Sequence, residues 1–199
     1  MDGIRPLGRL LMSIHTRSLS TPGLEDAAHA AYRLTGIVAF AALVALGARL
    51  SVPLWPVPIT LQVPFVLLAG AFLGARAGAG SMATYLAAGA LGLPVFAAGG
   101  GPGYFLGPTG GYLVGFVAAA AVVGLLAGSD AGLGRLLLAM TAGAAVIHLF
   151  GLLHLSLFLG RGPWQAVQDG LGPLLLVGTV LKVAGAATLV AAWRGLGRR

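Results

Sequence analysis

Apolar residues occur along the chain in six long runs that are separated by proline, glycine or charged positions. A membrane-spanning helix needs about 20 such residues, so six spans with short loops require about 150–170 residues. One membrane domain therefore accounts for nearly all of the 199 residues. The runs predict an all-α protein with transmembrane helices at residues 31–50, 59–74, 78–93, 109–127, 135–159 and 171–193.

The second and third predicted spans are short, and proline or glycine stands at their ends, at Pro58, Gly74, Gly78 and Pro94. Non-helical backbone is tolerated at membrane depth only where it is buried in protein or lines a cavity. We therefore expect the loops next to these two spans to border a ligand cavity.

The composition favours a membrane protein, because 58% of the residues are hydrophobic, 9% are charged and the mean hydropathy is +0.95. Soluble domains carry about 25% charged residues, so a soluble globular enzyme is excluded. The net charge of +7 does not indicate nucleic-acid binding, since no basic run is interleaved with aromatic residues. The absence of cysteine excludes disulfides, thiol catalysis and Cys-ligated metal centres.

Residues 1–30 differ from the rest because they combine several arginines with two prolines and an acidic pair. This composition favours a cytosolic tail ahead of one membrane domain at residues 31–199. A membrane-surface helix is the alternative, and Pro6 and Pro22 limit its length. A signal peptide is not expected, since no uninterrupted apolar core occurs before residue 36.

Lysine and arginine are distributed unequally between the two sides of the six spans. Only Arg49 and Arg161 fall on the side opposite to the two termini, and Lys182 lies within a span. Basic residues are in excess on the cytoplasmic side, so both termini are predicted in the cytoplasm and the external loops at residues 51–58, 94–108 and 160–170. The basic residues on the cytoplasmic side are Arg5, Arg9, Arg17, Arg33, Arg76, Arg135, Arg194, Arg198 and Arg199.

Lys182 stands in the middle of the last span, about 16 Å from either end at 1.5 Å per residue. An ammonium there costs about 2.5–3.5 kcal/mol on insertion scales, so it is expected to face a cavity, a partner group or a ligand anion. The spans contain no acidic residue that could pair with it. This favours ligand contact over snorkelling to the interface. Thr179, one turn earlier on the same face, adds a hydroxyl.

Four prolines between residues 52 and 64 make the first external loop stiff and extended. Thr60 and Gln62 lie in this stretch, at the start of the second span. An amide there can both donate to and accept from a neutral polar ligand. Hydrogen bonding between helices is the alternative role for both side chains.

The second external loop and the start of the fourth span, residues 92–112, combine glycines with aromatic residues. Glycines allow the backbone to approach a ligand closely, and aromatic rings can cover its apolar part. No GK[ST] or GxGxxG motif occurs, so ATP hydrolysis by this chain is not expected. The candidate ligand residues of this segment are Phe96, Gly99, Gly100, Tyr104 and Tyr112.

His148 and His154 in the fifth span lie about 240° apart around a helix and do not form a paired metal site. The sequence contains no HExxH or GxSxG motif and no intramembrane carboxylate pair, so no metal or catalytic site is expected. Packing is the expected role of both histidines, although His154 is a candidate to approach the cavity.

Small residues recur four positions apart in three of the spans, which permits close approach of helices. Internal packing explains most of these pairs, whereas the alanine-rich first span also suits docking of another membrane subunit. The pairs are Ala41 and Ala45, Gly70 and Gly74, and Gly111 and Gly115.

Three ordered motifs are PVPITLQ at residues 56–62, GLPVFA followed by glycines from residue 92, and GPTGGYLVGF at residues 107–116. Because of these motifs, the chain resembles the BioY family over about residues 35–192. Members of this family are the biotin-specific S components of energy-coupling factor (ECF) transporters. HLFGLLHLSLFLG at residues 148–160 is similar to the family's fifth helix. GTVLK at residues 178–182 occupies the place of its GDLLK-like motif.

The chain departs from the family pattern at three positions. Thr179 stands in place of the family's aspartate, while the lysine is retained as Lys182. The change removes an acceptor for ligand N–H groups and a partner for the lysine. Val177 replaces the usual proline, and His154 stands where the family tends to have tryptophan.

The resemblance implies the ECF S-component fold, six helices around an externally open pocket in a bacterial cytoplasmic membrane. It also implies biotin capture, with release driven by a transmembrane T subunit and ATPase subunits, and no cofactor or enzymatic activity in this chain. It favours Ala41 and Ala45 as T-subunit contacts, and Lys182 could bind either the carboxylate or the ureido oxygen of biotin. The expected ligand-binding residues are Thr60, Gln62, Phe96, Gly99, Gly100, Tyr104, Tyr112, His154, Thr179 and Lys182.

Three alternatives stay open beside this interpretation. An S component for another vitamin is one, because Thr179 departs from the family pattern. A self-sufficient oligomeric transporter or channel belongs to a different class and predicts solute flux without ATP. An intramembrane enzyme is the weakest alternative, since the sequence supplies no convincing nucleophile and base.

Overall fold

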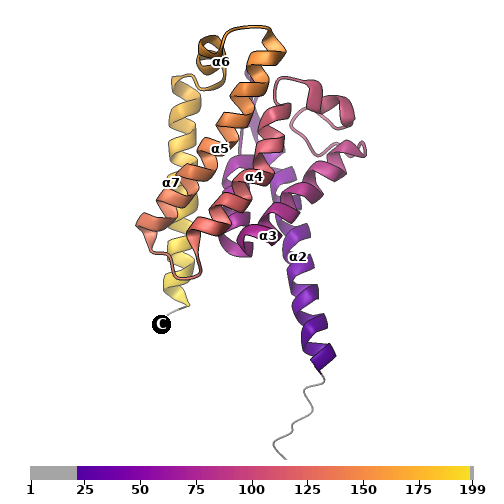
Figure 1. Ribbon diagram of the computed structural model, residues 1–199, viewed down its shortest axis with the longest axis vertical. Helices are drawn as coiled ribbons and strands as arrows, with labels where there is room; N and C mark the ends of the chain where they lie inside the picture. Colours follow the sequence, from indigo (N-terminus) through magenta and orange to yellow (C-terminus); the bar gives the residue numbers. More distant parts are fainter. Residues whose placement is uncertain (1–21, 198–199) are drawn as a thin grey trace, which may run out of the picture. The chain divides into compact units, whose positions relative to one another are not determined.

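The computed structural model describes residues 22–197, which are mainly helical (Figure 1). Residues 35–197 form one compact unit, and the start of the first helix belongs to a separate one. Five helices, α2, α3, α4, α5 and α7, are long and apolar enough to cross a membrane. The helices are α2 (Pro22–Arg49), α3 (Gln62–Ala90), the 3-10 helix η1 (Pro102–Leu106), α4 (Gly110–Ala127), α5 (Leu133–Leu159), α6 (Pro163–Gly170) and α7 (Pro173–Leu196).

The boundaries of the fourth, fifth and sixth predicted spans agree with α4, α5 and α7 to within three residues. The first predicted span is too short, because α2 begins at Pro22 and takes in part of the expected tail. The remainder of that tail, residues 1–21, lies outside the described residues. The all-helical expectation is correct for the membrane-spanning part of residues 35–197.

The second and third predicted spans correspond to the two limbs of α3, which are separated by a kink. Gly74 has φ 76° and ψ 177°, which are not helical angles, so the helix is interrupted at this glycine. A positive φ is accessible to glycine because it has no Cβ. The limbs at residues 62–73 and 75–90 are about 18 and 24 Å long at 1.5 Å per residue. Each limb is shorter than the hydrocarbon core of a bilayer, which is about 30 Å thick.

The interruption at Gly74 removes helical donors from the carbonyl groups of the preceding turn. One of these carbonyls is served by another helix, because the Arg194 guanidinium donates from Nη2 to the Ala71 carbonyl oxygen at 3.1 Å. The last turn of α7 is thereby tied to the bend in α3.

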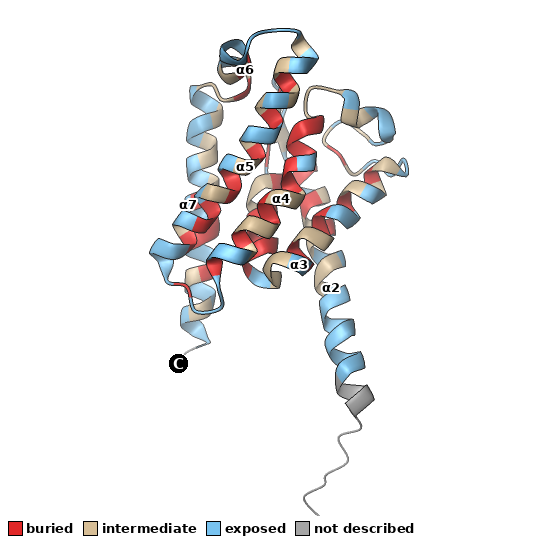
Figure 2. Cartoon of the chain, in the orientation of Figure 1, coloured by how far each residue is buried: buried red, intermediate tan, exposed pale blue. Residues whose placement is uncertain are grey.

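Glycines allow the backbones of α3, α4 and α5 to approach closely. A Cβ added at Gly70 would lie 2.8 Å from Val123 Cβ, and one added at Gly115 would lie 3.1 Å from Ile147 Cα. Figure 2 shows the buried residues concentrated where these three helices face one another. The prediction that small residues serve packing is therefore confirmed at Gly70 and Gly115, whereas Gly74 forms the bend.

The outer faces of α5 and α7 carry large apolar side chains that are mostly exposed. Leu138, Leu157, Leu174 and Leu181 are each more than 60% exposed. A contiguous apolar exterior of this kind is unfavourable in water and suits lipid.

The irregular segments of residues 35–197 gather mostly at one end of the bundle. The predicted extended loop forms a short antiparallel hairpin, β1 (Ser51–Val52) with β2 (Ile59–Thr60), after which the Leu61 N–H donates to the Gly47 and Leu50 carbonyls at 3.1 Å. Figure 1 shows α6 and the connection between α3 and α4 at this same end. All three predicted external loops therefore lie together.

We expect Gly70→Ala to destabilise the fold, because the added Cβ overlaps Val123 and the backbone of α4. Overpacking of this kind costs about 1–3 kcal/mol. Gly185→Ala in α7 is the matched control, since its Cβ would meet no atom within 4 Å. The control should be neutral or stabilise by up to about 1 kcal/mol, in line with helix propensity. Melting temperatures of the two purified variants in detergent make the comparison, and equal temperatures would contradict the packing argument.

Candidate functional site

A chain of three hydrogen bonds joins the hairpin to α3 and to the loop that follows α3. Thr60 Oγ1 donates to Gln62 Oε1 at 3.0 Å, and Gln62 Nε2 donates to the Tyr85 hydroxyl at 2.6 Å. The Tyr85 hydroxyl donates in turn to the Val95 carbonyl at 3.2 Å. Thr60 and Gln62 are buried, so this chain satisfies polar groups that would otherwise be costly to bury.

Aromatic side chains support the loop between α3 and α4 from below. Phe96 is fully buried, and its ring centre lies 5.4 Å from that of Tyr85, 4.7 Å from Tyr104 and 5.5 Å from Phe105. The Phe96 N–H donates to the Gly99 carbonyl at 2.8 Å, which closes a tight turn. Edge-to-face aromatic packing thus fixes the loop against the helices.

Tyr112 connects α4 to α5 and α6. Its hydroxyl donates to the Gly170 carbonyl at 3.2 Å, and its ring meets that of His148 edge-on, with centres 6.1 Å apart. A Cβ at Gly151 would overlap the Tyr112 ring. Glycine at that position therefore makes room for the tyrosine.

Polar groups from α5 and α7 meet at the other end of the same space. His148 Nε2 lies 3.4 Å from Thr179 Oγ1, and Thr179 Oγ1 donates to the Leu175 carbonyl at 2.9 Å. Lys182 follows one turn later and is half-buried. Within residues 22–197 its ammonium has no hydrogen-bond or ion-pair partner.

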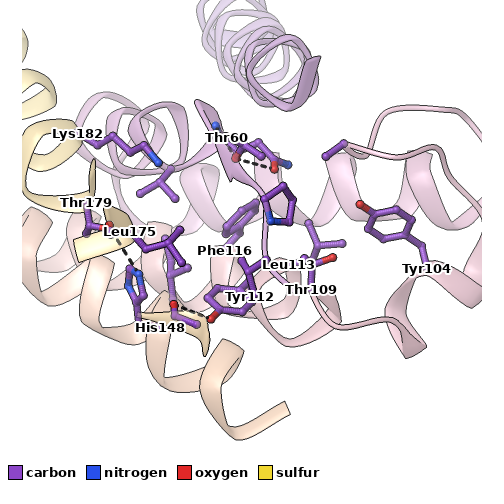
Figure 3. A pocket seen from close by; sticks show the side chains of 17 residues that line it. Thr60, Tyr104, Thr109, Tyr112, Leu113, Phe116, His148, Leu175, Thr179 and Lys182 are labelled. Atoms are coloured by element: carbon purple, nitrogen blue, oxygen red, sulfur yellow. Dashed lines mark hydrogen bonds between the residues drawn. The ribbon is translucent and has the colours of Figure 1, made fainter. Parts of the chain in front are cut away.

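Side chains from the hairpin, α3, α4, α5 and α7 line one pocket, which is shown in Figure 3. It is mainly apolar, with polar groups at separate points of the wall, and each predicted external loop contributes to it. Across residues 22–197, no group of three or more histidine or acidic side chains is arranged to hold a metal ion. The lining consists of Val57, Pro58, Thr60, Gln62, Val63, Ala97, Tyr104, Thr109, Tyr112, Leu113, Phe116, Ile147, His148, Gly170, Leu175, Thr179 and Lys182.

Six of the ten expected ligand residues come together in this pocket: Thr60, Gln62, Tyr104, Tyr112, Thr179 and Lys182. The other four do not line it. Phe96 packs beneath the loop, and Gly99 and Gly100 form the turn beside it. His154 points to the loop before α4, where its Nε2 lies 2.9 Å from the Gly107 carbonyl oxygen.

Two residues at or beside the pocket are not predicted from the sequence as site residues. Tyr85 lies in an alanine-rich stretch with no motif around it, and its role depends on the bend that brings the second limb of α3 back towards Gln62. The sequence predicts a packing role for His148, but His148 lines the pocket and His154 does not. The sequence carries no signal that separates the two histidines, because their surroundings depend on the packing of α4 and α7 around α5.

The proposed docking pair on α2 lies on an inward-facing side of the helix. Ala41 is 8% exposed and belongs to the hydrophobic core, and Ala45 is partly buried against the same core. The exposed small residues of this part of α2 are Ala39 and Ala42. Ala41 and Val44 are three residues apart and share one face of α2, so the orientation that buries Val44 also buries Ala41.

Apolar helices enclose this pocket, and its wall carries an ammonium that has no partner within residues 22–197. Such an arrangement is typical of a membrane protein that binds a small polar solute. The sequence profile of the BioY family matches residues 18–198. The chain belongs to the BioY family.

The chain is similar to the biotin transporter BioY of Thermotoga maritima, with 46% identity over 120 residues that cover 60% of this chain and 71% of that protein. It is also similar to the biotin transporter BioY of Rhizobium etli, with 37% identity over 168 residues, or 78% and 88% of the two chains. The crystal structure of the S-component for biotin from an ECF-type ABC transporter has a similar fold. Its TM-score is 0.75 at 25% identity, and the match covers 86% of this chain and 93% of that one.

We expect Tyr85→Phe to weaken the fold around the pocket mouth. The substitution removes the acceptor of the Gln62 amide and the donor to the Val95 carbonyl, and an unsatisfied buried polar group costs about 1–3 kcal/mol. Thermal unfolding in detergent measures the effect. Tyr32→Phe is the control, because Tyr32 is 80% exposed and should tolerate the change. Equal melting temperatures for the two variants would show that the hydrogen-bond chain does not hold the loop.

Proposed function

We propose that this chain is the biotin-binding S component of an ECF-type transporter in a bacterial cytoplasmic membrane. The observation that carries the proposal is the pocket at the loop end of the bundle, where Lys182 supplies a half-buried ammonium without a partner in the described part of the chain. Membership of the BioY family and similarity to proteins named biotin transporters support this choice of ligand.

The pocket wall matches the three chemical parts of biotin. Tyr104 and Phe116 offer apolar ring surface for the fused bicycle, and the Thr109 hydroxyl adds a neutral polar group. Lys182 supplies the cation for a carboxylate or for a strongly polarised carbonyl oxygen. The amide of Gln62 is engaged with Thr60 and Tyr85, so it acts chiefly by holding the mouth of the pocket in place.

We propose six membrane crossings with both termini in the cytoplasm. The two limbs of α3 then act as the second and third crossings, joined at the Gly74 bend. The excess of arginine on the side of the termini supports this orientation. The pocket consequently opens to the outside.

Biotin binding requires the pocket to widen. The free space inside is about 60 Å³, whereas small-molecule sites usually measure about 300–1,000 Å³. The hairpin and the loop between α3 and α4 form the mouth, and both contribute side chains to the pocket wall. Ligand exchange therefore takes place by displacement of the mouth loops.

Release requires partners, because the sequence contains no nucleotide-binding motif. A transmembrane T subunit and two ATPase subunits fit this role. The exposed face of α2 is the proposed contact for the T subunit, since Ala39 and Ala42 allow close approach of a partner helix and Val38 and Leu46 flank them.

Purified chain in detergent should bind biotin at equilibrium, and Lys182→Ala should weaken that binding. Loss of a charge-assisted hydrogen bond costs about 1.5–3 kcal/mol, which corresponds to roughly 10- to 100-fold in Kd. Gln62→Ala should weaken it less, because the amide acts on the mouth. Thr188→Val, on an exposed part of α7, is the control and should bind as the native chain does.

Competition with riboflavin and thiamine tests the choice of vitamin in the same assay. Displacement of biotin by biotin alone is the expected result. If folded protein bound another vitamin and not biotin, the biotin proposal would be wrong and the S-component proposal would stand. Unchanged affinity in both Lys182→Ala and Gln62→Ala would show that the ligand binds elsewhere.

Liposomes that contain this chain alone should take up no biotin against a gradient. Adding the T subunit and the ATPases with ATP should produce concentrative uptake. Radiolabelled biotin measures both conditions, and liposomes with denatured chain provide the background. Flux through the chain alone without ATP would instead favour a self-sufficient transporter or channel.

A further inference from the structure

His148 of α5 lines the pocket, and the proposed biotin contacts do not include it. Its Nδ1 lies 2.8 Å from the Ala144 carbonyl oxygen, one turn earlier in α5. A carbonyl oxygen only accepts hydrogen bonds, so this nitrogen carries the ring proton. In a neutral imidazole the other nitrogen, Nε2, is then an acceptor.

Thr179 does not consume this acceptor. Its hydroxyl has a single proton, and the Leu175 carbonyl oxygen at 2.9 Å is closer to it than His148 Nε2 at 3.4 Å. A threonine in a helix commonly donates to the carbonyl four residues earlier. The lone pair of Nε2 is therefore available to a donor inside the pocket.

A donor and an acceptor thus line the same region of the pocket from two helices. Figure 3 shows Lys182 reaching in from α7 and His148 from α5, on either side of Thr179. A carboxylate would use the ammonium and leave the Nε2 acceptor unmatched. A cyclic urea satisfies both groups, because its carbonyl accepts from the lysine while an adjacent N–H donates to the histidine.

We infer that His148 is a specificity-determining residue whose Nε2 accepts a hydrogen bond from a ureido N–H of the bound ligand. Lys182 donates to the ureido oxygen, so the ring enters the pocket first and the carboxylate remains towards the mouth. This inference rests on the proposed biotin function, and it assigns a ligand group to a histidine that the sequence predicts as a packing residue.

His148 borders a second space besides the pocket, and its substitutes must keep the two spaces apart. His148 and Thr179 also line an apolar groove between α5 and α7, so a small side chain would join pocket and groove. His148→Phe keeps a ring in the wall and removes the acceptor. His148→Gln places an amide oxygen at a similar distance from the backbone and retains one.

Equilibrium binding of two ligands to these variants tests the inference. The ligands are biotin and biotin methylated on a ureido nitrogen, with each nitrogen methylated in turn. His148→Phe should weaken biotin binding by about 10-fold or more, and His148→Gln by clearly less. One of the methylated ligands should bind the native chain more weakly than biotin does, and His148→Phe should not weaken that ligand further. A purely structural role for the ring would weaken both ligands equally.

His154→Phe is the matched control, because it removes a histidine of the same helix that lies outside the pocket. It should preserve the ratio of affinities for biotin and the methylated ligand. Melting temperature and gel filtration establish that each variant is folded. The inference is overturned if His148→Phe binds biotin as the native chain does, or if it loses both ligands in equal proportion. If the native chain binds no biotin, the proposed function fails and this inference fails with it.

Discussion

The arrangement of this protein depends on one constraint, that backbone polar groups inside a bilayer must find partners within the protein. Helices meet the constraint along most of residues 35–197. Where the helical pattern stops, other groups take over, as the Arg194 guanidinium does for the Ala71 carbonyl beside the Gly74 bend. The β1–β2 hairpin and the turn at Phe96 pair the backbone of the mouth in the same way.

The same constraint explains why the pocket and the irregular segments occupy one end of the bundle. A loop that must be shielded from lipid can also enclose a solute, provided that its own polar groups are satisfied. The hydrogen bonds from Thr60 through Gln62 and Tyr85 to Val95 meet that requirement with side chains. The polar residues at the mouth therefore stabilise the loops, whereas the Lys182 ammonium has no partner within residues 22–197 and is the proposed ligand contact.

Much of this architecture could be predicted from the sequence, because span length and charge are local properties. An intramembrane cation needs a polar environment, so the sequence predicts a cavity beside Lys182, and Lys182 and Thr179 do line the pocket. The break between the second and third spans is predicted at Gly74 and is found there, whereas the immediate start of the next limb at residue 75 is not predicted. The burial of Ala41 could not be predicted from the sequence, because which alanines of α2 face inward depends on the helices that pack against it.

The two histidines of α5 show the same limit within the site. Both stand in apolar surroundings in the sequence, and six residues of helix turn them about 240° apart. Only the packing of α4 and α7 around α5 decides that His148 meets Tyr112 and Thr179 while His154 meets Gly107.

The proposed hydrogen-bond acceptor, His148 Nε2, therefore lies on α5, and the cation, the Lys182 ammonium, lies on α7. Their separation then depends on the register of α5 against α7, and a shift of one residue moves a group by about 1.5 Å along the helix axis. A contact beyond about 3.5 Å is no longer a hydrogen bond. A small sliding or tilting of α7 is therefore enough to break the hydrogen bonds of a ligand that both His148 and Lys182 hold. Under the proposed function, a pocket built between α5 and α7 binds its ligand while the two helices stay in register, and it releases the ligand when a partner subunit displaces one of them.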